Sequence, residues 1–354
     1  MGQALSEHVH TWLDRHTAPG RPVALACSGG GDSVALLMLA SGWAHRRERR
    51  LIILTVDHGL RAESAAEAAS VVRLSGRLGH DAQVLKWTAP RTGSGIQAAA
   101  RHARHGLLAD AARAAGAGDI LLAHTRDDQA ETVWMRLAAG GGWRGCAGMA
   151  PVAPSPVWPQ GRGMRVLRPL LDVSRADLRR WLRGQGASWC EDPGNEDDHY
   201  TRVRVRKALG SLRDAGFDDA RLGALACEER TVADAERRAA ARLAGRAVRI
   251  LDWGGVRVDT AELAAAGATV RHRVIEAACL AVSGREALPA RAAVERIDAG
   301  LTGGQTVTAG GVMAGNWQGG AWLVRDPGAV SGRDGDDGAG QIAGPAAGVR
   351  IWDG

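Results

Sequence analysis

The residues with the clearest chemistry lie in the segment SGGGDS, which directly follows the apolar run VALAC. Gly29, Gly30 and Gly31 permit tight turns and let a ligand approach the backbone closely. Successive backbone N–H groups at the start of a helix, with the hydroxyls of Ser28 and Ser33, can bind a phosphate group. A turn that only joins a strand to a helix is the alternative. The complete pattern after an apolar strand favours an anion-binding loop.

The loop lacks the lysine of a Walker motif, which contacts the β and γ phosphates when the terminal phosphoryl group is transferred. Without that lysine the loop is suited to bind pyrophosphate as a leaving group, so the bond that breaks lies at the α-phosphorus of ATP. Asp32 belongs to the same segment, yet a carboxylate repels phosphate. A cation must lie between them, either Mg²⁺ or a positively charged substrate. We therefore predict a ligand with a pyrophosphate group at the loop, and Asp32 as a catalytic residue that contacts Mg²⁺ or an amine.

Strand and helix patterns alternate over the first half of the chain. Apolar runs at residues 23–27, 51–56, 82–87 and 119–124 are each followed by a segment with helical spacing. This alternation predicts an α/β fold with a doubly wound parallel sheet. In such a sheet the loops at the carboxyl ends of the strands share one crevice, where ligands bind.

Polar residues stand at two further strand ends. Asp57 and His58 follow the second predicted strand, and His124 ends the fourth. We expect these loops to converge with the glycine loop on one site. His58 is a candidate for ligand contact, although a histidine that is simply hydrogen-bonded at a strand end is a competing interpretation.

The segment HTRDDQAE also carries a cluster of acids. Asp127, Asp128 and Glu131 lie within one turn of the predicted helix, and Asp127 and Glu131 are spaced i, i+4. Carboxylates at this position can merely offset the helix dipole. They can also orient a cationic substrate and accept its proton.

Two arginine groups could meet phosphate. Arg101 and Arg104 are i, i+3 neighbours on a predicted helix, so both can face the crevice, although a solvated helix face would look the same. In YTRVRVRK, Arg202, Arg204 and Arg206 are two residues apart, which predicts one shared face of an extended segment. Such a stripe can neutralise phosphates.

Composition sets wider limits. The chain has 354 residues, 45% hydrophobic, and a formal net charge of +6, a balance that favours polyanionic partners without naming one. No apolar segment is long enough to cross a bilayer, and we expect a cytoplasmic protein. The five cysteines are scattered singly, so a zinc site or redox pair is not indicated. With Tyr 1 and Phe 1, we expect charge and shape to dominate any contact with RNA.

Pattern changes divide the chain into parts. We predict an ATP-binding catalytic domain at residues 1–215, a long charged helix at 216–246 as a connector, and a small α+β domain at 247–330 that recognises RNA. The Gly- and Asp-rich stretch 331–354 is predicted to be a flexible tail.

The SGGGDS loop after a first strand resembles that of the PP-loop ATP pyrophosphatases. Five further motifs, in order between residues 23 and 209, resemble the tRNA(Ile)-lysidine synthetase family: VDHGLR, the AR..R pattern of AAARHARH, HTRDDQAETVWMRLAAGGGWRGCAGM, VLRPLLDVSRADLRRWL and EDPGNEDDHYTRVRVR. The resemblance implies ligation of lysine to C2 of the wobble cytidine in a tRNA(Ile) with a CAU anticodon. ATP first adenylates the cytidine O2, and the lysine ε-amine then displaces AMP, which changes decoding from AUG to AUA.

For this chemistry the resemblance implies roles for the acids. Asp128, with Asp127 as a second candidate, would bind lysine, Asp32 would contact the amine or the metal, and His124 would position a ligand. This sequence departs from the family pattern at Thr125, where a second histidine is usual.

Adenylation develops negative charge around the α-phosphate, and arginine offers fixed, fork-like donors for it. We assign that catalytic role to Arg101, with Arg104 and Arg206 as candidates beside it. The family usually has asparagine where this chain has Val203.

Two other functions remain open at this stage. Another PP-loop enzyme, such as a tRNA thiolase or a small-molecule amidotransferase, would usually need paired cysteines or a glutamine-hydrolysing partner domain. A non-catalytic RNA-binding module that holds ATP only as a ligand would not need Asp32, Arg101 and Asp128 beside the phosphate loop.

Overall fold

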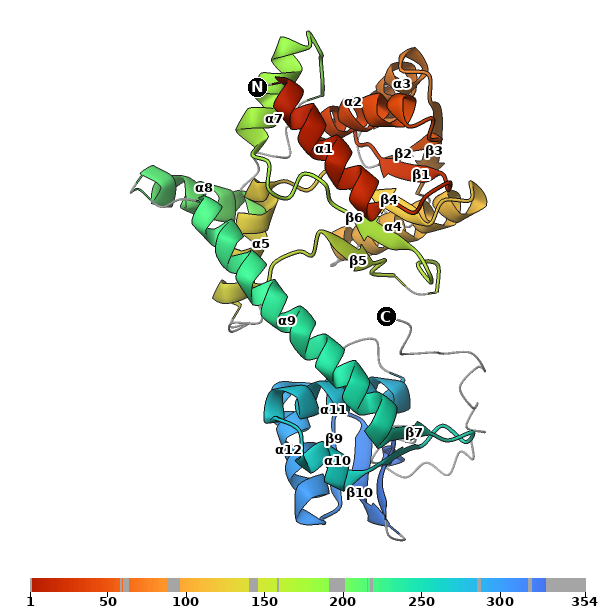
Figure 1. Ribbon diagram of the computed structural model, residues 1–354, viewed down its shortest axis with the longest axis vertical. Helices are drawn as coiled ribbons and strands as arrows, with labels where there is room; N and C mark the ends of the chain where they lie inside the picture. Colours follow the sequence, from red (N-terminus) through yellow and green to blue (C-terminus); the bar gives the residue numbers. More distant parts are fainter. Residues whose placement is uncertain are drawn as a thin grey trace. The chain divides into compact units, whose positions relative to one another are not determined.

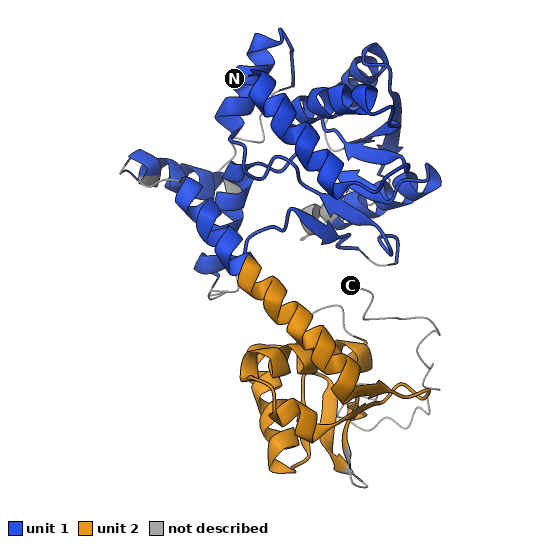
Figure 2. Ribbon diagram, in the orientation of Figure 1, with its two compact units in different colours: residues 1–230 blue, residues 231–354 orange. Residues whose placement is uncertain are grey.

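A computed structural model describes residues 2–57, 59, 64–87, 96–139, 146–157, 159–190, 201–214, 216, 219–284, 288–317 and 320–328. The chain forms two compact units, residues 1–230 and 231–354, and the division falls within the long helix α9 (Asp219–Ala247) (Figure 2). The charged helix predicted for this part of the sequence is therefore present. Among the described residues, no helix combines the length and the apolar character needed to span a membrane.

The first unit is built on a six-stranded sheet in the order β3-β2-β1-β4-β6-β5. Its strands are β1 (Val23–Ala26), β2 (Leu51–Asp57), β3 (Asp81–Lys86), β4 (Asp119–Leu121), β5 (Val152–Pro154) and β6 (Arg165–Leu167). All neighbours pair in parallel except β5, which runs antiparallel to β6 at one edge. The prediction of a doubly wound parallel sheet is confirmed.

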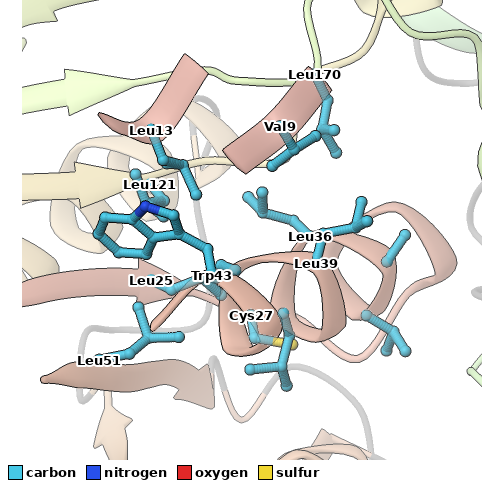
Figure 3. Close-up of a cluster of buried hydrophobic side chains, with 14 of the residues drawn as sticks. Val9, Leu13, Leu25, Cys27, Leu36, Leu39, Trp43, Leu51, Leu121 and Leu170 are labelled. Carbon is cyan, nitrogen blue, oxygen red and sulfur yellow. The ribbon is translucent and has the colours of Figure 1, made fainter. Parts of the chain in front are cut away.

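Helices cover both faces of this sheet (Figure 1). The helices of the first unit are α1 (Gly2–His16), α2 (Gly31–Arg46), α3 (Ser64–Arg77), α4 (Ile96–Ala114), α5 (Arg126–Ala138), α7 (Arg175–Gly184) and α8 (Thr201–Asp214). Residues of α1, α2, α3 and α7 share a core with one face of the sheet and residues of α4 with the other, whereas α5 packs on α8. Alternate residues of β1 enter different cores, because successive side chains of a strand point to opposite faces. Val23 and Leu25 pack with Trp43 of α2 and Leu13 of α1 (Figure 3). Ala24 and Ala26 belong to a second core that contains Leu108 of α4.

The predicted extended arginine stripe is wrong, because its residues form the helix α8. Val205 and Leu209 are spaced i, i+4 on one face of this helix and pack in a core with Ala130 and Val133 of α5. The short RVRVR alternation suggests a strand, but this packing selects the helix. In a helix, residues two apart do not share a face, so Arg204 is exposed whereas Arg206 is half-buried.

The second unit is an antiparallel five-stranded sheet in the order β7-β8-β11-β10-β9. The strands are β7 (Val248–Ile250), β8 (Val256–Val258), β9 (Val307–Ala309), β10 (Val312–Trp317) and β11 (Gly320–Arg325). Its helices are α10 (Thr260–Ala264), α11 (Ala268–Ser283) and α12 (Arg291–Gly303). The expected α+β unit is therefore present, and the predicted tail lies outside the described residues.

Candidate functional site

The glycine loop joins β1 to α2, as its sequence predicts. Gly29 has a φ angle of +87°, a conformation that residues with a Cβ rarely adopt. Gly30 is the N-cap of α2 and has no side chain with which to satisfy the first N–H groups of the helix. The loop thus presents a helix N-terminus to an anion. On its other side, the Cys190 amide donates to the Gly29 carbonyl at 3.0 Å, which ties the loop to the chain after α7.

The Ser33 side chain holds the glycine loop together through hydrogen bonds. Its buried hydroxyl donates to the Gly30 carbonyl at 2.8 Å and accepts from the Ser28 amide at 3.2 Å. The Ser28 hydroxyl lies 3.3 Å from it, on a residue that is exposed. Of the two predicted phosphate-binding hydroxyls, Ser28 is therefore the better placed to reach a ligand.

We expect the substitution Gly29→Ala to weaken ATP binding. A Cβ in this left-handed conformation costs about 1–2 kcal/mol, and the strain would act directly on the phosphate-binding backbone. The dissociation constant for ATP should rise roughly tenfold in isothermal titration calorimetry. The matched control is Gly30→Ala, because Gly30 has an extended backbone and a Cβ there would meet only the Ser28 hydroxyl, at 3.7 Å. Equal affinities in the two variants would contradict the proposed strain.

The acid cluster is assembled around a cation that sequence reasoning missed, Arg175 at the start of α7. Its guanidinium donates to Asp128, to Glu131 at 2.9 Å and to Asp32 at 3.3 Å. Burial lowers the pKa of Arg175, but the charges of Asp128, Glu131 and Asp32 outweigh that effect and raise it. The loop and the acid cluster are therefore one connected site.

Asp128 is fixed by the start of its own helix. Its Oδ2 accepts from the Thr125 amide and the Thr125 hydroxyl, each at 2.8 Å, which forms a capping box with the N-cap Thr125. Burial favours the neutral acid, but the charge of Arg175 and the hydrogen bonds from Thr125 hold the pKa of Asp128 below its usual value. Asp128 is therefore held as a carboxylate.

The pKa of Asp32 is shifted in the opposite direction to that of Asp128. Burial raises its pKa above the usual value, and the nearby charge of Asp128 adds to that effect, although Arg175 and Arg179 oppose it. Its Oδ1 is buried and has no hydrogen-bond partner among the described residues, and the Arg179 Nε lies 4.0 Å from it. Arg179 in turn lies 5.1 Å from the centre of the Trp189 ring. One Asp32 oxygen is thus directed at a position that an additional cation or donor could fill.

The remaining acids and arginines lie beside this centre. Arg206 donates to Glu131 at 3.0 Å, so the predicted catalytic arginine does reach the cluster, from a helix. The second carboxylate oxygen of Glu131 is buried and finds no hydrogen-bond partner in the described part of the chain. Asp127 is turned elsewhere, because its Oδ2 accepts from the Arg175 amide at 2.9 Å and its Oδ1 lies 3.7 Å from Arg213.

Other predicted residues lie around the loop to different degrees. His124 accepts a hydrogen bond on Nδ1 from Arg168 at 3.1 Å, and it directly precedes the Thr125 N-cap that holds Asp128. Arg104 is close enough to Cys27, just before the loop, to lower the pKa of that thiol, whereas burial, the larger effect, raises it. His58 and the side chain of Arg101 lie outside the described residues, so their roles stay predictions.

Asp57 closes the second loop of the crevice. Its Oδ1 accepts from the Gly59 amide at 2.9 Å and from the Ser64 hydroxyl at 2.7 Å. These contacts connect the end of β2 to the start of α3.

Arg175 and Arg179 left a signal in the sequence that could have been used. Ser174 is the N-cap of α7, and the motif SRADLRR places both arginines on the first turns of that helix. Arginines spaced i, i+4 face the same side, so one helix face carries two cations toward Asp32.

Known proteins are similar to this chain in sequence and in fold. The PP-loop domain family matches residues 4–212. The chain is 41% identical over 302 residues to the tRNA(Ile)-lysidine synthase of Bradyrhizobium sp., covering 81% of this chain and 83% of that protein. Identity to the enzyme of the same name from Methylobacterium nodulans is 42%, over 82% of this chain and 84% of that one. With the Hyphomonas neptunium relative it is 50%, over 53% of this chain and 50% of that one.

Among solved structures, the U34-tRNA thiolase NcsA from Methanococcus maripaludis, determined with its [4Fe-4S] cluster, is similar with a TM-score of 0.53. The match covers 65% of this chain and 78% of the thiolase, at 14% sequence identity, and so shows the fold alone. The relatives that align along most of their length decide the family. The chain belongs to the tRNA(Ile)-lysidine synthase family of PP-loop proteins.

Proposed function

We propose that this protein is a tRNA(Ile)-lysidine synthase, a ligase that joins lysine to C2 of the wobble cytidine in a tRNA with a CAU anticodon. One observation carries the proposal beyond family membership. The phosphate loop and the acid cluster meet at Asp32, which places an anion site and a cation site side by side. A ligase that activates one substrate with ATP and then joins a positively charged amine to it needs that arrangement. The need for tRNA and ATP together supports a cytoplasmic location.

The first half-reaction uses the loop and the arginines. The cytidine O2 attacks the α-phosphorus of ATP, and pyrophosphate leaves while held by the N–H groups after Gly29. Arg101, with Arg104 and Arg206 as further candidates, meets the negative charge that develops on the α-phosphate. These assignments rest on motif position and on the location of Arg206 and Arg104 near the loop and cluster.

The second half-reaction uses the acids. The lysine ε-amine attacks C2 of the adenylated cytidine, AMP leaves with the C2–O2 bond electrons, and the amine loses a proton. Asp128, with its lowered pKa, is suited to hold the ammonium by charge, whereas Asp32, with its raised pKa, is the better proton acceptor. Because Arg175 already contacts both carboxylates, lysine must displace its guanidinium or bind alongside it.

The described residues also fit a magnesium ion held jointly with ATP. No group of three or more His, Cys, Asp or Glu suited to a metal occurs among them, so the protein alone does not form a cage. Asp32 nevertheless has a buried Oδ1 without a partner beside the loop. One carboxylate together with phosphate oxygens is the usual protein contribution to Mg²⁺. When bound, Mg²⁺ would neutralise charge on the phosphates.

The proposal is tested by incubating the purified chain with ATP, labelled lysine and a transcript of the CAU-anticodon tRNA. We expect label in the tRNA, a mass increase confined to the wobble cytidine, and release of AMP and pyrophosphate. A transcript with a GAU anticodon is the matched control and should remain unlabelled. An unchanged wobble cytidine in the CAU transcript would contradict the proposal.

The thiolase alternative is not favoured. The cysteines Cys27, Cys146 and Cys279 are buried, and the described residues hold no cluster with Cys or His that could bind a metal centre. Burial also raises the pKa of Cys27 and raises that of Cys279 to about 12, which suppresses the reactive thiolate.

A further inference from the structure

The sheet of the second unit has one face covered by helices and an opposite face, called the open face, on which Arg249 and Arg257 are exposed. Val256, Val258 and Leu323 are buried in a core with α11, α12 and the end of α9 (Figure 1). Their immediate neighbours along the strands point the other way. Arg257 is paired with Trp322 of β11 on one side and with Arg249 of β7 on the other, so these three residues share the open face.

A second tryptophan adds to this face from the turn between β7 and β8. The Trp253 ring is stacked on that of Trp322, with 6.3 Å between centroids and 26° between planes. Trp253 is still 62% exposed, so its ring offers surface for another partner. Gly255 makes room for this ring, because a Cβ there would lie 2.0 Å from a Trp253 ring carbon.

Positive charge accompanies the two rings. The Arg257 guanidinium carbon lies 5.7 Å from the centre of the Trp322 ring, a cation–π arrangement. Arg249 is exposed, with its guanidinium hydrogen-bonded to the Gly245 and Val248 carbonyls, and Asp252 in the turn is the acidic residue beside Trp253. Aromatic faces next to arginine are the combination that binds unpaired nucleotides, by base stacking and phosphate contact.

We propose that Trp253, Trp322 and Arg257 form a contact surface for an unpaired nucleotide of the tRNA. The base stacks on the exposed side of Trp253, and Arg257 meets the adjoining phosphate. The choice of tRNA as the RNA rests on the proposed function. Because Tyr and Phe are scarce, the composition predicts that charge and shape dominate contacts with RNA. The stacked pair Trp253 and Trp322 adds base stacking to these contacts.

The test measures binding of the full chain to the CAU-anticodon tRNA. Trp253→Ala should raise the dissociation constant roughly tenfold, within the range known for loss of one stacked base. The KM for tRNA should rise in parallel, while kcat at saturating tRNA and the KM values for ATP and lysine stay unchanged. Trp253→Phe should restore most of the affinity. Leu288→Ala is the control, because Leu288 is a comparably exposed apolar residue of the same unit, at 61%.

Two further variants separate stacking from charge. Gly255→Ala keeps both tryptophans but displaces the Trp253 ring, so it should weaken tRNA binding as Trp253→Ala does. Arg257→Gln should reduce the slope of log affinity against log salt by about 0.7–0.9, the loss of one phosphate contact. An unchanged slope of log affinity against log salt would show that Arg257 makes no phosphate contact.

Wild-type affinity for tRNA in Trp253→Ala would overturn the proposal. So would a dimer in sedimentation analysis that this substitution dissociates without a change in tRNA affinity, because the rings would then bind a second copy. The two proposals fail separately. A chain that binds tRNA through Trp253 but transfers no lysine would refute the ligase function only, and lysine transfer that is indifferent to Trp253 would refute the surface only.

Discussion

Arg175→Ala should destabilise the first unit and abolish lysine transfer. The Arg175 side chain is 20% exposed and is the shared partner of Asp32, Asp128 and Glu131. Removing one member of such a buried ion pair costs about 3–5 kcal/mol, because the remaining charges are left without compensation. The midpoint of thermal unfolding should fall by roughly 10 °C, as about 2–4 °C per kcal/mol is expected for a unit of this size.

Arg180→Ala is the matched control for this substitution. Arg180 lies on the same helix, but its ion pair with Asp177 is exposed, so both stability and activity should be retained. Arg175→Lys keeps the charge without the fork of donors that reaches three carboxylates, and should fall between the two. Circular dichroism melting curves and the lysine-transfer assay provide both readouts. Wild-type stability in Arg175→Ala would show that the acids are neutral or otherwise compensated.

Asp32→Asn should remove activity while leaving the protein at least as stable at neutral pH. Removal of a group that contacts the reacting atoms typically lowers the rate by about 10²–10⁴-fold. The stability effect follows from the pKa of Asp32, which burial raises in the folded state. The unfolded carboxyl ionises at the lower pKa, so folding loses stability as pH rises from that value through the folded one. Asparagine cannot ionise and avoids this loss.

Asp14→Asn provides a contrast of opposite sign. Arg47 and Trp43 donate to the Asp14 carboxylate and hold its pKa below the usual value. Its contribution to stability is present above the unfolded pKa and disappears as pH falls through the folded one, so Asp14→Asn should lower stability at pH 7 and leave activity unchanged. Urea unfolding of both variants at pH 7 and pH 4 would measure this difference. If Asp32→Asn lost as much stability at pH 7 as Asp14→Asn, the raised pKa of Asp32 in the folded protein would be contradicted.

The sheet and the loop could be predicted because their signals are local. The apolar run before Ser28, the glycines and the helical spacing after Asp32 each specify structure within a few residues. The contacts of Arg175 are not local, because this residue lies 47 residues from Asp128 and 143 from Asp32 along the chain. A single sequence does not state which distant cation fills an acid cluster.

The segment around Val203 shows a second limit. Its alternation of valine and arginine has the period of a strand, and the packing of Val205 and Leu209, four residues apart, against α5 and α9 selects the helix. Arg206 nevertheless contacts Glu131 from its half-buried helical position, and its role in catalysis stays a prediction. The position of Arg206 in the motif suggested that it lies near the acids, although the extended conformation predicted for the segment is wrong.

The contact between Cys190 and the glycine loop has a consequence for synthesis of the chain. The loop at Gly29 leaves the ribosome long before its partner, because about 160 residues separate them. At typical translation rates of about 5–20 residues per second, the delay is on the order of ten seconds or more. During that interval the phosphate loop of the nascent chain lacks its backbone hydrogen bond from Cys190. The phosphate loop therefore gains its full set of backbone contacts only near the end of translation of the first unit.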